Sequence, residues 1–227
     1  MPSESVLKPR RPIAAIAYLR PLLASVIALL LAIGAWVITV MSSARPSWNA
    51  DALLAEAPTL PDAWNTGEIE VTSVDWGAAS TEVFSPAREY RASTSAWRHW
   101  SDGGQGGSIP AVTQLIFVYE NPLLASIAYW LSRPEWAYSD TWPNFSTYDE
   151  SSVHPAIEPY ASKSADQDSS VCGMGGPSSC QVWIYWSRHG QYIHQVFFFA
   201  PNQGIDTTLF GEFVRQFDRQ VEMRLSR

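Results

Sequence analysis

The chain has 227 residues, with 15 Lys and Arg against 22 Asp and Glu, so its formal net charge is −7. At 46% hydrophobic and 16% charged residues it has ample material for an apolar core, which excludes a disordered or collagen-like chain. The acidic balance also argues against a nucleic-acid binder, because such proteins carry basic patches that neutralise phosphates.

The first predicted element is a membrane-spanning helix over residues 21–41. This run of 21 residues holds no charge and matches the roughly 20 residues that a helix needs to cross a bilayer. Four basic residues and one acid precede it, so the positive-inside rule predicts a cytoplasmic segment over 1–20 and export of everything after the helix. The lipid bilayer is therefore the expected partner of residues 21–41.

A cleaved secretory signal is the alternative to this anchor. Ser42, Ser43 and Ala44 supply the small residues that a cleavage site near Ala44 requires. The length of the apolar run favours the uncleaved anchor, because the apolar region of a signal peptide has about 7–15 residues. Both alternatives export the same domain.

Residues 42–66 are rich in Ser, Pro and Ala without a sustained period, and they predict a stalk between membrane and domain. The domain is expected over 67–227. Its first strand is predicted at 68–74, where polar and apolar residues alternate, and another at 111–119.

A helix is predicted from Asn121, as its cap, with Pro122 in the first position, to about residue 133. Residues 134–170 show no period and predict a long irregular connection. A final amphipathic helix is predicted over 206–225, because apolar residues recur there at helical spacing.

Between these helices, a hairpin is predicted from two β-rich runs, 181–188 and 191–199, joined by His189-Gly190. The register places Trp186 opposite Ile193, Ile184 opposite Gln195 and Trp183 opposite Val196. Together the elements predict an α+β fold, with a mostly antiparallel sheet covered by the C-terminal amphipathic helix and preceded by one transmembrane helix.

The two cysteines, Cys172 and Cys180, both lie in the exported part, where a disulfide is the expected state. A metal or redox pair is the alternative, but the spacing is not that of a CxxC motif. Nearby, Asp166 and Asp168 match the first ligand positions of a calcium loop, whereas later positions do not. A solvated acidic loop is expected there, and cation binding stays open.

The four histidines, at positions 99, 154, 189 and 194, match no metal or nucleophile motif, so the sequence predicts no catalytic residue, cofactor or metal ligand. A hydrogen-bonded structural role is expected for His194, because it lies inside a predicted strand. The other unusual feature is tryptophan, with ten of 11 residues beyond the apolar run. Candidate interface or ligand contacts are Trp97, Trp100, Trp136, Tyr138 and Trp142. The alternative is that such rings cover a thin core.

These features predict a non-enzymatic single-pass membrane protein whose acidic, Trp-rich extracytoplasmic domain binds a membrane-protein partner, as an accessory subunit or scaffold. The first alternative is an extracytoplasmic sensor of a glycan or lipid ligand. The second is an exported hydrolase, which would need a nucleophile beside a histidine or carboxylate with a shifted pKa.

Overall fold

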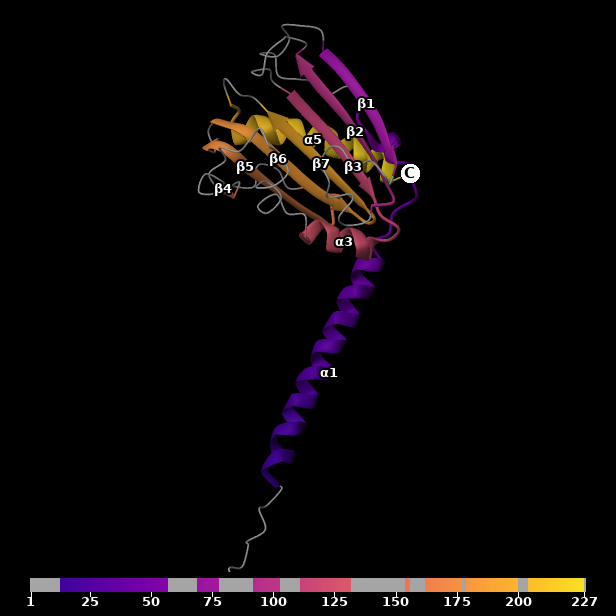
Figure 1. The fold of residues 1–227 in the computed structure, drawn as a ribbon, viewed down its shortest axis with the longest axis vertical. Helices are drawn as coiled ribbons and strands as arrows, with labels where there is room; N and C mark the ends of the chain where they lie inside the picture. Colours follow the sequence, from indigo (N-terminus) through magenta and orange to yellow (C-terminus); the bar gives the residue numbers. More distant parts are fainter. Residues whose placement is uncertain are drawn as a thin grey trace, which may run out of the picture. The chain divides into compact units, whose positions relative to one another are not determined.

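The computed structural model describes residues 13–56, 69–77, 92–102, 111–131, 154–155, 162–176, 179–199 and 204–226. The chain divides into two units, which meet between Thr39 and Val40. The first unit holds most of helix α1 (Ile13–Met41), and the second holds the sheet and the remaining helices (Figure 1). The described elements confirm an α+β chain with an apolar N-terminal helix, an antiparallel sheet and a C-terminal helix.

Helix α1 contains the predicted apolar run and begins before it. Residues Pro21–Met41 form a stretch that is long and apolar enough to cross a membrane, and almost all of its side chains are exposed. The two hydroxyl side chains of Ser25 and Thr39 donate back to the carbonyls of Pro21 and Ala35, each at 2.9 Å. These polar groups are thus bonded within the helix, as an apolar environment requires.

The described strands form one antiparallel sheet in the order β1-β2-β3-β7-β6-β5-β4. The strands are β1 (Ile69–Gly77), β2 (Thr94–Asp102), β3 (Ala111–Val118), β4 (His154–Pro155), β5 (Gln167–Gly176), β6 (Ser179–His189) and β7 (Tyr192–Phe199). Strands β3, β7 and β6 occupy its centre, and each of them contributes several buried apolar side chains.

The two longer helices of the domain pack on opposite faces of this sheet. Trp183 and Tyr185 of β6 belong to a core cluster with α5 (Thr207–Leu225), whereas Ile184 and Trp186 belong to a cluster with α3 (Pro122–Leu131). Because alternate residues of a strand point to opposite faces, the two clusters lie on the two sides of the sheet. Figure 1 shows α5 running along one face and α3 crossing one end of the strands.

Both helices begin after a capping residue: the cap at Asn121 is the one that the sequence predicts, and Asp206, predicted as the start of the C-terminal helix, caps α5. The carboxylate of Asp206 accepts from the N–H of Leu209 at 2.8 Å, and the side-chain oxygen of Asn121 accepts from the N–H of Leu124 at 3.0 Å. Each cap satisfies a backbone donor that has no partner inside its helix. Helix α3 is described as far as Leu131, and residues 132–133, to which the prediction extends it, lie outside the described part.

The predicted hairpin register is wrong, although the two strands are correct. Trp186 lies opposite Gln195, Ile184 opposite Phe197 and Trp183 opposite Phe198. The turn residues are Gly190 and Gln191, because His189 still pairs with Tyr192. Gly190 is the first turn residue, and its φ of 61° is a left-handed backbone conformation that favours glycine.

Residues 43–56 belong to the domain, although the sequence predicts a stalk over 42–66. Ala50, Leu53 and Leu54 are buried in one core cluster with Val221 and Leu225 of α5, and a short 3-10 helix, η1 (Asp51–Leu53), lies among them. A solvated stalk would expose these apolar side chains to water, at a cost in free energy. The domain therefore begins well before residue 67, and residues 57–66 lie outside the described part.

Polar contacts also hold this segment, which we call the docked segment (residues 43–56), to the hairpin. The N–H of Arg45 donates to Oε1 of Gln191 at 2.9 Å, and Nε2 of Gln191 donates back to the carbonyl of Arg45 at 2.7 Å. The Tyr192 hydroxyl donates to the carbonyl of Pro46 and accepts from the N–H of Trp48, both at 2.7 Å. The chain is thus fixed to the domain within a few residues of the end of α1.

Candidate functional site

Trp100, one of the aromatic residues predicted to contact a partner or ligand, lies in the core. It is 2% exposed, and its ring centre lies 5.5 Å from that of Phe217 on α5. Trp97 is half-buried and packs against the cluster under α3. The remaining candidates, Trp136, Tyr138 and Trp142, lie outside the described residues. Trp100 therefore covers the core, which is the alternative role for these rings, and is not a surface contact.

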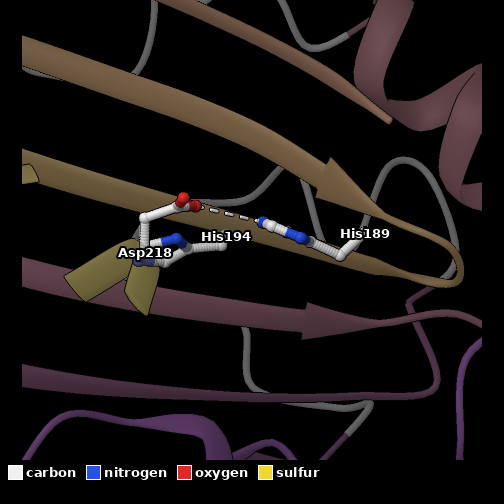
Figure 2. Close-up of side chains that lie close together, drawn as sticks. All are labelled: His189, His194 and Asp218. Carbon is white, nitrogen blue, oxygen red and sulfur yellow. Dashed lines mark ion pairs between the residues drawn. The ribbon is translucent and has the colours of Figure 1, made fainter. Parts of the chain in front are cut away.

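Among the described residues, a close group of two histidines and an aspartate lies between the sheet and α5. His189 of β6, His194 of β7 and Asp218 of α5 are each 1% exposed or less, and one polar atom of each lies within 4.8 Å of the others (Figure 2). We call these residues, together with Gln114, Ser162, Tyr185 and Ser187, the buried polar network. Only a fully bonded network is stable at such depth, because an unpaired buried polar group is costly.

Asp218 is held by three side chains, two from β6 and one from the segment before β5. Its Oδ1 lies 3.4 Å from Nε2 of His189 and accepts from the Tyr185 hydroxyl at 3.3 Å, while its Oδ2 accepts from the Ser162 hydroxyl at 2.6 Å. Burial by itself raises the pKa of this carboxyl, but the hydrogen bonds from His189 and Ser162, with the electrostatic interactions of both histidines, outweigh it and lower the pKa to about 2. Asp218 is therefore ionised in the folded domain.

The buried charge of Asp218 also affects the pKa of Tyr185. Burial, followed by the repulsion between a phenolate and Asp218, raises the pKa of Tyr185 well above its ordinary value. The phenol therefore keeps its proton and acts as a donor to the carboxylate.

The tautomer of His194 is fixed by a backbone group. The N–H of Ala55 can only donate, and it donates to Oε1 of Gln114 at 2.7 Å, so Nε2 of that amide is turned toward Nε2 of His194, 3.2 Å away. Since the amide nitrogen is a donor, Nε2 of His194 accepts and its proton sits on Nδ1, which lies 3.4 Å from the Ser187 hydroxyl. Burial, the main cause, lowers the pKa of His194 to about 3, so the ring is neutral.

This arrangement does not suit a metal ion at His194. A ligating imidazole needs a nitrogen lone pair directed at the metal. In His194 one nitrogen accepts from Gln114 and the other carries the proton, so no lone pair is available without disrupting the contact with Ala55. His189 and Asp218 alone are too few for a stable site.

The network also lacks the geometry of a catalytic triad. In a triad the two nitrogens of one imidazole contact the nucleophile and the carboxylate separately. Here Nε2 of His189 faces both Ser187, at 3.2 Å, and Asp218, at 3.4 Å. The side chains of the network thus bond to each other across β3, β6, β7, α5 and the segment before β5, and the N–H of Ala55 links the docked segment to Gln114.

A second polar cluster surrounds Arg188, a side chain that is only 4% exposed. Its Nη1 lies 3.2 Å from Oδ2 of Asp166, and its Nε donates to Gln167 at 2.8 Å. The same Asp166 oxygen accepts from the N–H of Gly190 at 2.6 Å. Burial lowers the pKa of Arg188, and the nearby Asp166 charge partly offsets this effect.

The contacts around Arg188 show which groups bind Asp166 and Asp168, the acidic pair that matches the first positions of a calcium loop. Asp166 is occupied by Arg188 and Gly190, with Arg45 at 3.6 Å, and Asp168 accepts from the N–H of Ser162 at 2.7 Å. Both carboxylates therefore bond to donors of the protein itself.

No protein-family model, curated protein or solved structure matches the chain. The docked segment connects to both polar clusters, through Ala55 to Gln114 and through Ser43 and Arg45 to Arg188 and Asp166.

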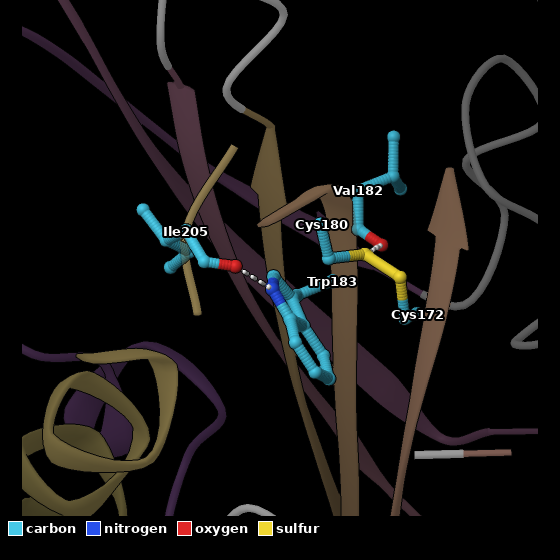
Figure 3. Close-up of a disulfide and its surroundings, with 5 residues drawn as sticks. All are labelled: Cys172, Cys180, Val182, Trp183 and Ile205. Atoms are coloured by element: carbon cyan, nitrogen blue, oxygen red, sulfur yellow. Dashed lines mark hydrogen bonds between the residues drawn. A yellow bond between two sulfur atoms is a disulfide. The ribbon is translucent and has the colours of Figure 1, made fainter. Parts of the chain in front are cut away.

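The disulfide between Cys172 and Cys180 is formed, as the sequence predicts. It joins neighbouring strands β5 and β6, and both cysteines are buried in the cluster under α5 (Figure 3). Beside it, the indole N–H of Trp183 donates to the carbonyl of Ile205 at 3.0 Å. The bridge therefore joins β5 to β6, and hydrogen bonds of Cys180 and Trp183 with Ile205 connect this strand pair to the residues before α5.

Sequence reasoning missed that Asp218 meets the histidines. The signal was present, because Asp218 follows Val214 by four residues and precedes Val221 by three, which puts it on the buried stripe of α5. An acid in such a position needs buried donors, and the central strands of the sheet supply them.

Proposed function

We propose that the protein is a single-pass membrane protein whose extracytoplasmic domain is non-enzymatic and binds a membrane-protein partner, as an accessory subunit or scaffold. The apolar run Pro21–Met41 is the anchor. Four basic residues precede it, whereas 11 basic and 21 acidic residues follow it, which favours a cytoplasmic N-terminus.

The observation that carries this proposal is the docked segment. A stalk would let the domain sample a large volume away from the bilayer. Instead, Arg45 and Pro46 are hydrogen-bonded to the hairpin almost directly after Met41, where the apolar run ends. A domain that begins within a few residues of its anchor along the chain reaches partners that are themselves in the membrane, which favours an accessory subunit over a freely moving receptor.

The docked segment also favours the uncleaved anchor. The hydroxyl of Ser43 accepts from Nη1 of Arg188 at 3.2 Å, and the carbonyl of Ser43 lies too close to Gly190 for any larger residue there. Cleavage after Ala44 would remove Ser43 and leave Arg188, buried at 4% exposure, without one of its acceptors.

The buried polar network supports a non-enzymatic role. Its histidines and Asp218 are covered by α5 and the docked segment, and their polar atoms are directed at one another. A catalytic group has to reach a substrate, so these side chains serve the packing of the domain better than a reaction.

The test is purification of the full chain from its native membrane in mild detergent, through a C-terminal affinity tag, followed by mass spectrometry. We expect an intact N-terminus and a membrane protein recovered in stoichiometric amount. A chain that begins near Arg45 and elutes alone would contradict both the anchor and the partner.

A double variant separates the role of docking from that of the anchor. Gln191→Ala with Tyr192→Phe removes the hydrogen bonds to Arg45, Pro46 and Trp48 while it leaves the apolar run unchanged. We expect membrane retention to persist and partner recovery to fall. Glu212→Gln, on the exposed face of α5, is the matched control and should recover the partner normally. Equal recovery by the double variant would show that docking does not position the partner site.

A further inference from the structure

The outer face of α3 is apolar. Its sequence, PLLASIAYWL, contains no charged residue. Ala125, Ala128 and Tyr129 face the sheet, whereas Ile127, Trp130 and Leu131 are 42%, 47% and 48% exposed. The outer face of a surface helix in a soluble protein is normally polar, and a helix that is apolar on all sides is normally buried in protein or in lipid.

Helix α3 starts at the end of the domain where the chain arrives from α1. The N–H of Tyr119, three residues before Pro122, donates to the carbonyl of Gln191 at 2.9 Å. The side chain of the same Gln191 exchanges two hydrogen bonds with Arg45. One turn residue therefore holds both the approach to α3 and the segment that follows Met41.

The rest of α3 stays at this end of the sheet. Tyr129 packs against Trp186 with ring centres 6.4 Å apart, and its hydroxyl donates to Ser169 at 3.3 Å. Trp186 lies close to the hairpin turn, so the helix crosses the strands near the turn (Figure 1). The helix does not extend toward the opposite end, where Cys180 and Ile205 pair.

We propose that the outer face of α3 lies in the interfacial region of the lipid bilayer and is a second membrane contact of the domain. This inference rests on the proposed membrane anchor. A ten-residue helix is about 15 Å long and can lie flat at the headgroup level, with its aliphatic side chains directed toward the acyl chains. Tryptophan favours this region because its indole ring is apolar with a polar edge.

Chain connectivity selects the bilayer over other occupants. The apolar run ends at Met41, and the docked segment holds the next residues against the turn beside which α3 begins. Once Met41 is at the membrane surface, α3 is brought to the same surface without a partner. A protein partner, or another part of this chain, would have to displace lipid from that position.

The test places a fluorophore on α3 in the full chain, reconstituted in phosphatidylcholine nanodiscs. The two native cysteines are joined in the disulfide, so a new cysteine is the single free thiol. Ile127→Cys carries the environment-sensitive label, and Leu131→Cys is a second position in case one label disturbs the helix. Glu212→Cys, exposed near the start of α5, is the matched control. A nitroxide-bearing phosphatidylcholine and aqueous iodide are the two quenchers.

We expect lipid nitroxide to quench the label at 127 and 131 and to leave the label at 212 unchanged, whereas iodide quenches only the label at 212. Quenching of 127 and 131 by iodide alone would place the face in water and overturn the proposal. Protection from both quenchers would show that protein covers the face, and would also overturn it. Failure of the chain to elute with the nanodiscs would instead refute the anchor, and this inference with it.

Discussion

Arg45 and Gln191 exchange two hydrogen bonds although 146 residues separate them in the sequence. The first lies just beyond the apolar run and the second forms the tip of the central hairpin. This reciprocal pair makes the chain after α1 part of the domain. We therefore expect loss of this pair to destabilise the docked segment more than the sheet.

The variant Gln191→Ala tests this relationship. Each partly buried hydrogen bond contributes about 0.5–1.5 kcal/mol, so we expect a loss of about 1–3 kcal/mol in the free energy of unfolding. Hydrogen exchange should accelerate in peptides covering 43–56, with little change in β6 or β7. Gln220→Ala, a half-buried residue on α5, is the control and should leave exchange unaltered. Unchanged exchange in the variant would mean that apolar packing alone fixes the docked segment.

Asp166→Asn tests the ion pair with Arg188. The substitution keeps an acceptor for the N–H of Gly190 but removes the charge that faces a guanidinium of 4% exposure. A buried charge that loses its partner costs about 3–5 kcal/mol, and we expect the lower end because Asp166 keeps some contact with water. Asp168→Asn, whose carboxylate accepts from a backbone N–H, should cost less. Denaturant titration of both variants measures the difference, and equal losses would contradict the assignment.

Calcium should not stabilise the domain. Both Asp166 and Asp168 already bond to donors of the protein, so a cation would have to break those contacts in order to bind. We expect the thermal midpoint to be the same in excess Ca²⁺ and in chelator. A ligand that binds only the folded state raises the midpoint by mass action, so a clear rise with Ca²⁺ concentration would refute this expectation.

The sequence predicts those parts of the fold that are decided locally. Asn121 caps α3 through a bond to the third residue onward, as the sequence predicts, and α5 begins one residue after its predicted start at Asp206. Strand β2 was not predicted, because Ser95, Ala96 and Trp100 are buried on both faces and no alternation results. The hairpin register is also not predictable from the sequence, because it depends on whether His189 pairs with Tyr192 or is itself a turn residue.

The candidate site depends on contacts between distant segments, and the sequence carries little information on those. Asp218 meets His189 only because α5 packs on that face of the sheet, and His194 is neutral because Ala55 orients Gln114. The docked segment was predicted as a stalk for the same reason. Its composition is that of a linker, and it is fixed by contacts with the hairpin, with α5 and with β3, which lie far from it in the sequence.

Removal of the disulfide, by Cys172→Ala with Cys180→Ala, should weaken the domain without unfolding it. The closed loop spans a sequence separation of eight residues, and the chain-entropy model gives about 2–3 kcal/mol for a loop of this size. The pairing of β5 with β6 continues beyond the bridge, so it persists. Denaturant titration measures the loss, and far-ultraviolet circular dichroism checks the fold. A double variant that is unfolded in the absence of denaturant would show that the bridge is essential.

The stability of the domain should fall with pH below about 6.5, and His194 is the residue that we expect to cause it. The pKa of His194 is lowered to about 3 by burial, whereas an unfolded histidine titrates near 6.5. Between these values the unfolded chain binds a proton that the folded chain does not, so stability is full above pH 6.5 and is lost as the pH falls toward 3. One proton of difference corresponds to about 1.4 kcal/mol per pH unit.

Asp218 adds to this loss only at lower pH. Its folded pKa of about 2 lies below the ordinary value near 4, so its contribution is present above pH 4 and is lost as the pH falls through 2. The window between pH 6 and pH 4 therefore separates the contribution of His194 from that of Asp218. His194→Gln keeps an acceptor for Gln114 and cannot titrate, so it should be less stable at pH 7 but show a slope reduced by up to about 1.4 kcal/mol per pH unit in that window. Denaturant titration at several pH values, followed by tryptophan fluorescence, gives both slopes. Equal slopes would mean that another group takes up the proton and that the tautomer fixed by Ala55 and Gln114 does not control the acid sensitivity of the domain.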